Sequence, residues 1–254
     1  MLGALTEAFG DDALMAFELD FSEGGVRTRR PLGLGWSKRF EEAEPVREFR
    51  WSKQGQGFAG WYYSVTVAGH VGYESWLERD RLLLMDRDRQ VVGIASQPFW
   101  LHWHDGRRTR RHAPDYFVRL ADGRARVVDV RAEDDMDDAA EEAFAATERA
   151  CTAVGWEFER AGRPEPVFMA NMRWLARYRR TRAGRPAEVG LRLLEAFAQP
   201  KGLWEGAGQA GDRLQVLPVL FHLLWSGALS ADLSGALLGI ESPVWAERGQ
   251  SWAG

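Results

Sequence analysis

Three acidic side chains and one cation stand at spacings that could perform metal-dependent chemistry on a phosphate. Glu78 lies at the start of an apolar helical run, and Asp115 lies at the mouth of a predicted strand. Asp129 and Arg131 are two residues apart in the next strand, so their side chains share a face, the one toward which Asp115 points. Carboxylate oxygens bind divalent metals, and a cation can stabilise charge on a phosphate. The pattern predicts a nuclease-like metal site.

Each of these residues also has a purely structural interpretation. Ser75 and Glu78 fit a helix N-terminal capping box, in which the glutamate reaches back to a backbone amide. Asp115 could be a polar strand end. Asp129 and Arg131 could be an exposed pair worth on the order of a few tenths of a kcal/mol. Only the combination of spacings favours chemistry, and from residue types alone the two interpretations remain equally open.

The elements that would position these residues form an α/β pattern. An apolar helix is expected after Ser75, and Asp122-Gly123 is expected to turn one strand back on the next. A helix over 138–154 should end at Gly155, and a strand should follow over 156–158. The acidic residues before that helix suit its N-terminus, where negative charge is favourable. These elements predict a mixed α/β core.

Several segments together resemble a known family. The stretches GYESWLERDRLLLMDRD, IASQPFWLHW, RRHAPDYFVRLADG and VVDVRAED look like the TnsA-type endonuclease subunit of heteromeric transposons. That family belongs to the PD-(D/E)xK nuclease superfamily, and the resemblance covers roughly residues 45 to 245. It implies a restriction-endonuclease-like core with a mixed central sheet, followed by a mainly helical C-terminal module that could be winged-helix-like.

The resemblance also implies a function. TnsA-type subunits cut the non-transferred strand at transposon ends, while a DDE-type transposase cuts and joins the other strand. Carried over by position, Glu78, Asp115 and Asp129 would bind Mg2+ or Mn2+, and Arg131 would occupy the basic position. Gln97 matches a position near the active-site strand whose role is open. Further implied partners are transposon-end DNA and an AAA+ ATPase regulator docking on the C-terminal region.

Arg131 departs from the family pattern, in which a lysine is usual. An arginine stays protonated and cannot act as a base, but it can still neutralise charge on a phosphate. We therefore expect reduced rather than abolished cutting relative to a lysine version. The alternative is a weak or inactive subunit that keeps the nuclease fold to bind DNA, the transposase or the ATPase.

The formal net charge is -4, but basic residues are clustered in two blocks of the sequence. The first precedes Asp115 and predicts DNA contacts that neutralise phosphates; it comprises Arg107, Arg108, Arg110, Arg111 and His112. The second runs from Arg173 to Arg185, and a solvated helix face explains it equally well. His112 could instead contact the metal site or be structural.

A zinc site is a rival to the nuclease interpretation. His102 and His104 share a face of a predicted strand, and His112 and Asp115 follow closely. The set lacks the ligand spacing of a known zinc motif. We therefore favour the nuclease site.

Composition and sequence patterns limit the cellular locations in which we expect this protein. Cys151 is the only cysteine of the 254 residues, which excludes an intrachain disulfide. The N-terminal residues lack a signal-peptide pattern, and no apolar stretch reaches the roughly 20 residues of a membrane span. We expect a cytoplasmic, nucleoid-associated protein with no membrane contact. The expected domains are an N-terminal arm (1–44), a nuclease-like domain (45–163) and a helical C-terminal domain (164–254).

Overall fold

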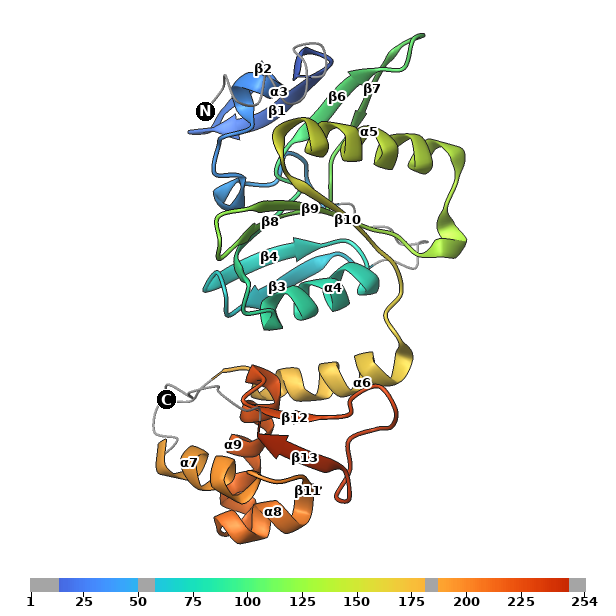
Figure 1. Cartoon of the computed structure of the whole chain (residues 1–254). Coiled ribbons are helices and arrows are strands. Elements are labelled where there is room, and N and C mark those ends of the chain that lie inside the picture. The colour runs from blue at the N-terminus through green and yellow to red at the C-terminus, as the bar shows by residue number, and fades with distance from the viewer. Residues whose placement is uncertain (1–13, 50–57, 181–186, 247–254) are drawn as a thin grey trace. The chain divides into compact units, whose positions relative to one another are not determined.

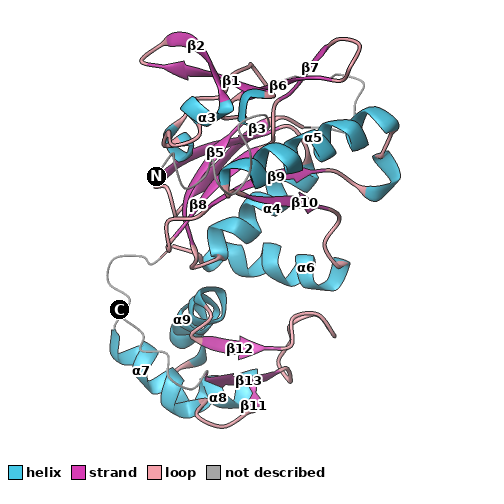
Figure 2. Cartoon of the chain, turned by 45° about the horizontal axis from the view of Figure 1, so that its top comes forward, coloured by secondary structure: helices cyan, strands magenta, loops and turns pink. Residues whose placement is uncertain are grey.

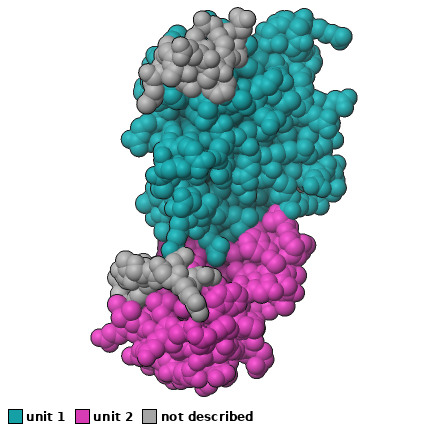
Figure 3. Space-filling model, viewed as in Figure 1, with its two compact units in different colours: residues 1–163 teal, residues 164–254 magenta. Residues whose placement is uncertain are grey.

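The computed structural model describes residues 14–49, 58–180 and 187–246 (Figure 1). The described residues form a mixed α/β structure with seven helices and several sheets, consistent with a nuclease-like core (Figure 2). The chain divides into two compact units, Met1–Arg163 and Pro164–Gly254 (Figure 3). Within the described residues, every helix is too short or too polar to cross a membrane.

A mixed four-stranded sheet forms the centre of the first unit. Its strand order is β10-β9-β8-β5, with β10 parallel to β9 and the other pairs antiparallel. The turn between β8 and β9 contains Gly123 at a φ of 88°, which glycine adopts without strain. The strands are β5 (Val91–Ser96), β8 (Tyr116–Leu120), β9 (Ala125–Val130) and β10 (Glu157–Ala161).

A second sheet corrects the prediction of an N-terminal arm over residues 1–44. Its strand order is β2-β1-β6-β7. Phe17, Leu19 and Phe21 are buried and alternate with polar residues, the pattern of a strand with one face on a core. That alternation outweighs the polar composition of the segment. The strands are β1 (Phe17–Glu23), β2 (Val26–Pro31), β6 (Trp100–His104) and β7 (Thr109–His112). A short helical stretch at residues 14–15 precedes β1.

The two sheets share one hydrophobic core with helix α5 (Asp138–Val154). Phe117 and Val127 of the central sheet belong to it, so their strand neighbours face the other side, where α4 (Trp76–Arg87) packs against β9. Helix α4 also packs on a hairpin of β3 (Gly60–Ser64) and β4 (Gly69–Tyr73). A short helix α3 (Leu32–Gly35) and a 3-10 turn (Phe40–Glu42) complete the unit's N-terminal part.

The predicted ends of α5 are confirmed. The Asp137 side chain accepts a hydrogen bond from the backbone N–H of Ala140, and Gly155 ends the helix at a φ of 72°. The acidic residues before α5 thus cap and precede its N-terminus. A 3-10 turn (Glu133–Asp135) connects β9 to this helix.

The second unit combines four helices with a small antiparallel sheet. The buried Asn171 amide joins α6 to the loop after β12, donating to two carbonyls and accepting from Leu238. The winged-helix type of this unit stays a prediction. Its elements are α6 (Pro166–Leu175), a 3-10 turn (Ala176–Tyr178), α7 (Ala187–Ala196), β11 (Lys201–Gly202), α8 (Leu203–Ala210), α9 (Arg213–Ser226), β12 (Leu229–Ala231) and β13 (Pro243–Ala246).

Candidate active site

Asp115 and Asp129 lie opposite each other at the open end of the β8–β9 hairpin. Each carboxylate accepts a hydrogen bond from a backbone N–H at the end of the facing strand. The Asp115 carboxylate accepts a 2.7 Å hydrogen bond from the backbone N–H of Val130. The Asp129 carboxylate accepts one of 3.2 Å from the backbone N–H of Asp115. Asp129 is fully buried. Strand pairing therefore brings these two predicted site residues together, as the turn at Asp122-Gly123 requires.

Glu78 caps the start of α4, as its structural interpretation predicts. The hydroxyl of Ser75 accepts from the backbone N–H of Glu78 at 3.1 Å and lies 2.9 Å from the Glu78 carboxylate. The other carboxylate oxygen accepts from the backbone N–H of Glu74 at 2.8 Å. The capping box and a site role are compatible, because the cap also holds the buried carboxylate in a fixed position.

The pKa values show that these carboxyls lie within electrostatic reach of one another. Burial is the main cause that raises the pKa of Asp115 well above its usual range, and the negative charges of Glu78 and Asp129 raise it further. Asp115 keeps some accessible surface as a residue, but its carboxyl is enclosed. Burial likewise raises the pKa of Glu78, with Glu74 contributing. Like charges held together without full compensation indicate a functional site more often than a structural one.

His112 holds the Asp129 carboxylate. Its Nε2 atom lies 2.9 Å from both carboxylate oxygens, and its ring meets Phe144 of α5 edge-on at 6.0 Å. The His112 side chain therefore contacts one of the predicted metal-binding acids.

Arg131 turns away toward the start of α5. Its Nε donates a 2.8 Å hydrogen bond to the carbonyl of Asp135, and its guanidinium lies 3.5 Å from the Asp137 carboxylate. Strand β9 ends at Val130, and the backbone N–H of Arg131 still donates to the carbonyl of Ala161 at 3.0 Å, so the side-chain contacts with Asp135 and Asp137 set the direction of Arg131.

Arg47 is a cation that the sequence pattern missed. Its guanidinium forms a two-point ion pair with Glu74, at 2.6 and 2.7 Å, beside the cap of α4. Its positive charge acts on Glu78 and Asp115, lowering the pKa of both carboxyls against the dominant effect of burial. Nothing in its local sequence marks Arg47, because it lies in a loop 31 residues before Glu78.

Gln97 connects the site to the loop that carries Arg47. Its backbone N–H donates to the carbonyl of Asp115, and its own carbonyl accepts from Val46, both at 2.9 Å. The residue is almost fully buried at a φ of 46°, which a non-glycine residue rarely adopts. Its side-chain oxygen is buried with no hydrogen-bond partner, which is costly and points to a ligand or water.

The first basic block lies on the β6–β7 hairpin, and its arginines have varied contacts. Arg107 and Arg108 are exposed at the tip, Arg110 pairs with Asp105 and Glu142, and Arg111 covers the Trp100 ring at 4.3 Å. A hollow of about 530 Å³ beside this hairpin is lined by Arg107 and Arg110 together with Trp103, His104, Asp105, Glu142 and Arg149. In the second block, Arg182 and Arg185 lie outside the described residues.

The residues of the rival zinc site are separated. His102 lies 3.7 Å from Asp20 of β1, whereas His104 accepts a hydrogen bond from Gly106 in the hairpin turn. His112 is engaged with Asp129. The three histidines therefore serve three different contacts.

The donor chemistry of the site suits a hard divalent cation. Carboxylate oxygens are ligands of the kind that Mg2+ and Mn2+ accept. The carboxylate oxygens already accept hydrogen bonds from the backbone, Ser75 and His112. Among residues 14–49, 58–180 and 187–246, no group of three or more acidic, histidine or cysteine side chains is arranged to hold a metal ion.

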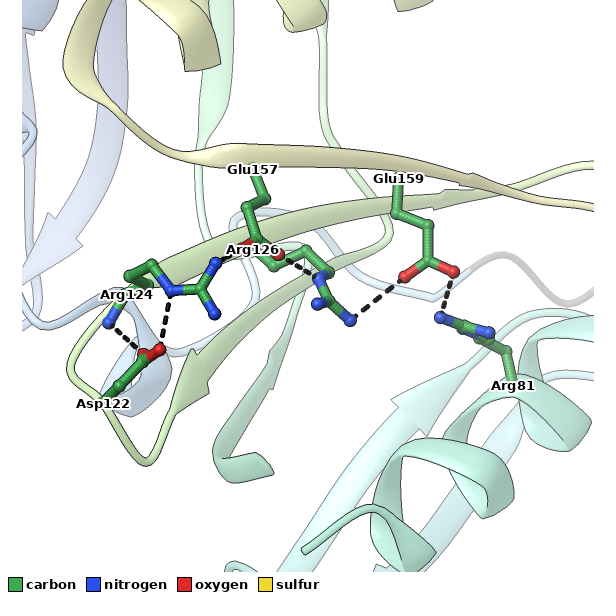
Figure 4. Close-up of polar contacts among 6 residues, drawn as sticks. All are labelled: Arg81, Asp122, Arg124, Arg126, Glu157 and Glu159. Carbon is green, nitrogen blue, oxygen red and sulfur yellow. Dashed lines mark hydrogen bonds and ion pairs between the residues drawn. The ribbon is translucent and has the colours of Figure 1, made fainter. Parts of the chain in front are cut away.

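A series of ion pairs runs from the β8–β9 turn along β9 and β10 to α4 (Figure 4). Arg126 of β9 bonds to Glu157 at 2.7 Å and to Glu159 at 3.5 Å. We call this set of alternating charges the ion-pair ladder. It comprises Asp122, Arg124, Glu157, Arg126, Glu159 and Arg81 of α4.

Comparison with protein families gives one match, to part of the first unit. Residues 88–160 match the family model described as TnsA-like endonuclease N terminal. The resemblance to a TnsA-like endonuclease subunit is therefore confirmed. The matched segment contains Asp115, Asp129, Arg131 and the β6–β7 hairpin, whereas Arg47 and Glu78 precede it. No curated protein matches the chain.

Proposed function

We propose that this chain is a metal-dependent DNA endonuclease subunit that cuts the non-transferred strand at transposon ends, together with a DDE-type transposase. The observation that carries the proposal is the TnsA-like endonuclease match over residues 88–160. It is supported by the position of Asp115 and Asp129, which meet at one strand end inside that segment. The proposed cofactor is Mg2+, with Mn2+ as a substitute.

In the proposed mechanism, Glu78, Asp115 and Asp129 would hold the cofactor. The bound ion would lower the pKa of water and stabilise charge on the cleaved phosphate. His112 keeps the Asp129 carboxylate in one orientation through its Nε2 atom. The Ser75 cap does the same for Glu78. Such fixed positions matter because misplacement of a reacting group by about 1 Å can cost on the order of a hundredfold in rate.

DNA would be held by the hairpin arginines, of which Arg107 and Arg108 are exposed. Phosphate contacts of this kind are independent of sequence and weaken with salt. The second unit, together with an AAA+ ATPase regulator, would connect cutting to target choice. This assignment extends the family resemblance.

The second candidate is a weak or non-cutting subunit that keeps the nuclease fold to bind DNA and its partners. The observation that favours it is the Arg131 side chain, whose guanidinium is engaged by Asp135 and Asp137 rather than by the acids. The two candidates differ in whether strand cleavage depends on Asp115.

The test is strand-specific cleavage of transposon-end DNA by the full chain with its transposase and Mg2+ or Mn2+. Wild type should cut the non-transferred strand, and Asp115→Ala should cut it about a hundredfold or more slowly. Asp122→Ala, at the other end of the hairpin, is the matched control and should cut normally. If wild type and Asp115→Ala leave the same strands intact, the cutting subunit is wrong and the non-cutting candidate stands.

A further inference from the structure

Arg47 has the geometry of an anchored active-site cation. Both terminal nitrogens of its guanidinium bond to the two oxygens of Glu74, a planar arrangement that fixes the side chain in two directions. The arginine side chain is only 22% exposed. The pair is therefore shielded better than an ordinary surface ion pair, whose contribution is small.

The Arg47–Glu74 pair is connected directly to the proposed metal ligands. The backbone N–H of Glu74 donates to the Glu78 carboxylate, so a shift of Glu74 would move the cap that holds Glu78. Burial lowers the pKa of the Arg47 guanidinium, but Glu74, Asp115 and Glu78 together raise it above its usual value. The guanidinium is therefore charged.

Arg131 is more exposed than Arg47 and has a more exposed partner. Its side chain is 37% exposed and bonds to a backbone carbonyl and to Asp137, which is 64% exposed. These contacts draw it toward the start of α5. Arg47, from outside the matched family segment, is instead linked to Glu78 through Glu74.

We propose that Arg47 supplies the cationic group of the active site, anchored by Glu74 and placed beside Glu78 and Asp115, in the role that the sequence pattern predicts for Arg131. This inference rests on the proposed function. The positive charge of Arg47 offsets part of the repulsion between Glu74 and Glu78. Because a guanidinium stays protonated, it contributes a constant charge rather than a proton.

The inference separates metal binding from cutting. A fixed positive charge near carboxylates disfavours a second cation, so its removal should tighten divalent binding. The same charge stabilises the negative charge that develops on the phosphate, so its removal should slow cleavage. A residue that only maintained the local fold would weaken both processes together.

The experiment compares Arg47→Gln with Arg131→Gln as the matched control, in the full chain. Mn2+ binding is measured by calorimetry without DNA, and strand cleavage is measured with the transposase present. Arg47→Gln should bind Mn2+ about three- to tenfold more tightly and cut about thirtyfold or more slowly. Arg131→Gln should change both quantities less than about threefold. Arg47→Lys, which keeps the charge but loses the two-point geometry, should recover part of the cleavage.

Circular dichroism and thermal unfolding of each variant establish that it folds. Weaker Mn2+ binding together with slower cleavage in a folded Arg47→Gln would overturn the inference in favour of a structural role. So would loss of cleavage in Arg131→Gln with normal cleavage in Arg47→Gln. If wild type cuts neither strand, the proposed function fails separately. The Mn2+ titrations then still decide the inference, since tighter binding by Arg47→Gln supports it and unchanged binding overturns it.

Discussion

The central sheet carries charges in two different arrangements, one along the ion-pair ladder and one at the open end of the β8–β9 hairpin. At the ion-pair ladder, each carboxylate meets an arginine, and hydrogen bonds from Arg124 lower the pKa of the exposed Asp122. At the open end of the hairpin, burial and neighbouring carboxylates raise the pKa of Asp115. At this end Arg47 bonds to Glu74, and His112 contacts Asp129.

This difference distinguishes a surface of paired charges from the candidate active site. Alternating charges on a partly exposed sheet face cost little to form and contribute little. Carboxylates that crowd together in an enclosed site oppose folding, and proteins retain such arrangements where activity requires them. Substitutions in the two arrangements should therefore affect stability and cutting in different combinations.

The largest combined effect is expected at His112. His112→Ala should lower the free energy of unfolding by about 1–3 kcal/mol, because the fully buried Asp129 carboxylate loses its side-chain partner. Cleavage should also fall, since Asp129 is no longer held. Denaturant unfolding and the strand-cleavage assay measure the two effects.

His104→Ala is the control for His112→Ala, because His104 is an exposed histidine whose hydrogen bond stays within its own turn. Equal effects of the two substitutions would show that the His112–Asp129 contact has no special role.

Asp115→Asn should have the unusual combination of lost cutting and unchanged or higher stability. An amide oxygen can still accept from Val130, while one of the crowded charges disappears, so unfolding should require up to about 1 kcal/mol more. The pKa of Asp115 is raised in the folded state, so its charge destabilises the fold above that pKa. The advantage of Asp115→Asn should therefore shrink as the pH falls through the raised value.

Chemical unfolding of wild type and Asp115→Asn across pH, without divalent ions, measures this difference. A clear loss of stability in Asp115→Asn at pH values above the raised pKa would mean that the ionised Asp115 carboxylate stabilises the fold, contrary to this expectation.

The smallest effect is expected in the ion-pair ladder. A double-mutant cycle of Arg126→Gln and Glu157→Gln should give a coupling of about 0.2–1 kcal/mol that decreases as salt is added. Cleavage should stay normal in both variants. A coupling well above this range, or a loss of cutting, would make the ladder part of the site.

Local patterns in the sequence predicted much of this protein. The helix over 138–154, its Gly155 end, the hairpin turn at Gly123 and the facing of Asp115 and Asp129 follow from periodicity, capping and turn chemistry. The strand over residues 17–23 was also readable from its alternation, but its polar and glycine-rich surroundings favoured the interpretation as an arm. Short-range rules succeed where the partners are neighbours in the chain.

Only the tertiary structure decided which cation accompanies the acids. The sequence by itself determined the nuclease-like family of residues 88–160 and the carboxylates at the hairpin mouth. It could not place Arg47 on Glu74 or His112 on Asp129, because those contacts join segments 27 and 17 residues apart. It also could not predict that the Arg131 side chain contacts Asp135 and Asp137, since those contacts depend on how the chain runs between β9 and α5. Side-chain charge acts through space, so the packing of separate elements, rather than their order, sets the electrostatics of the site.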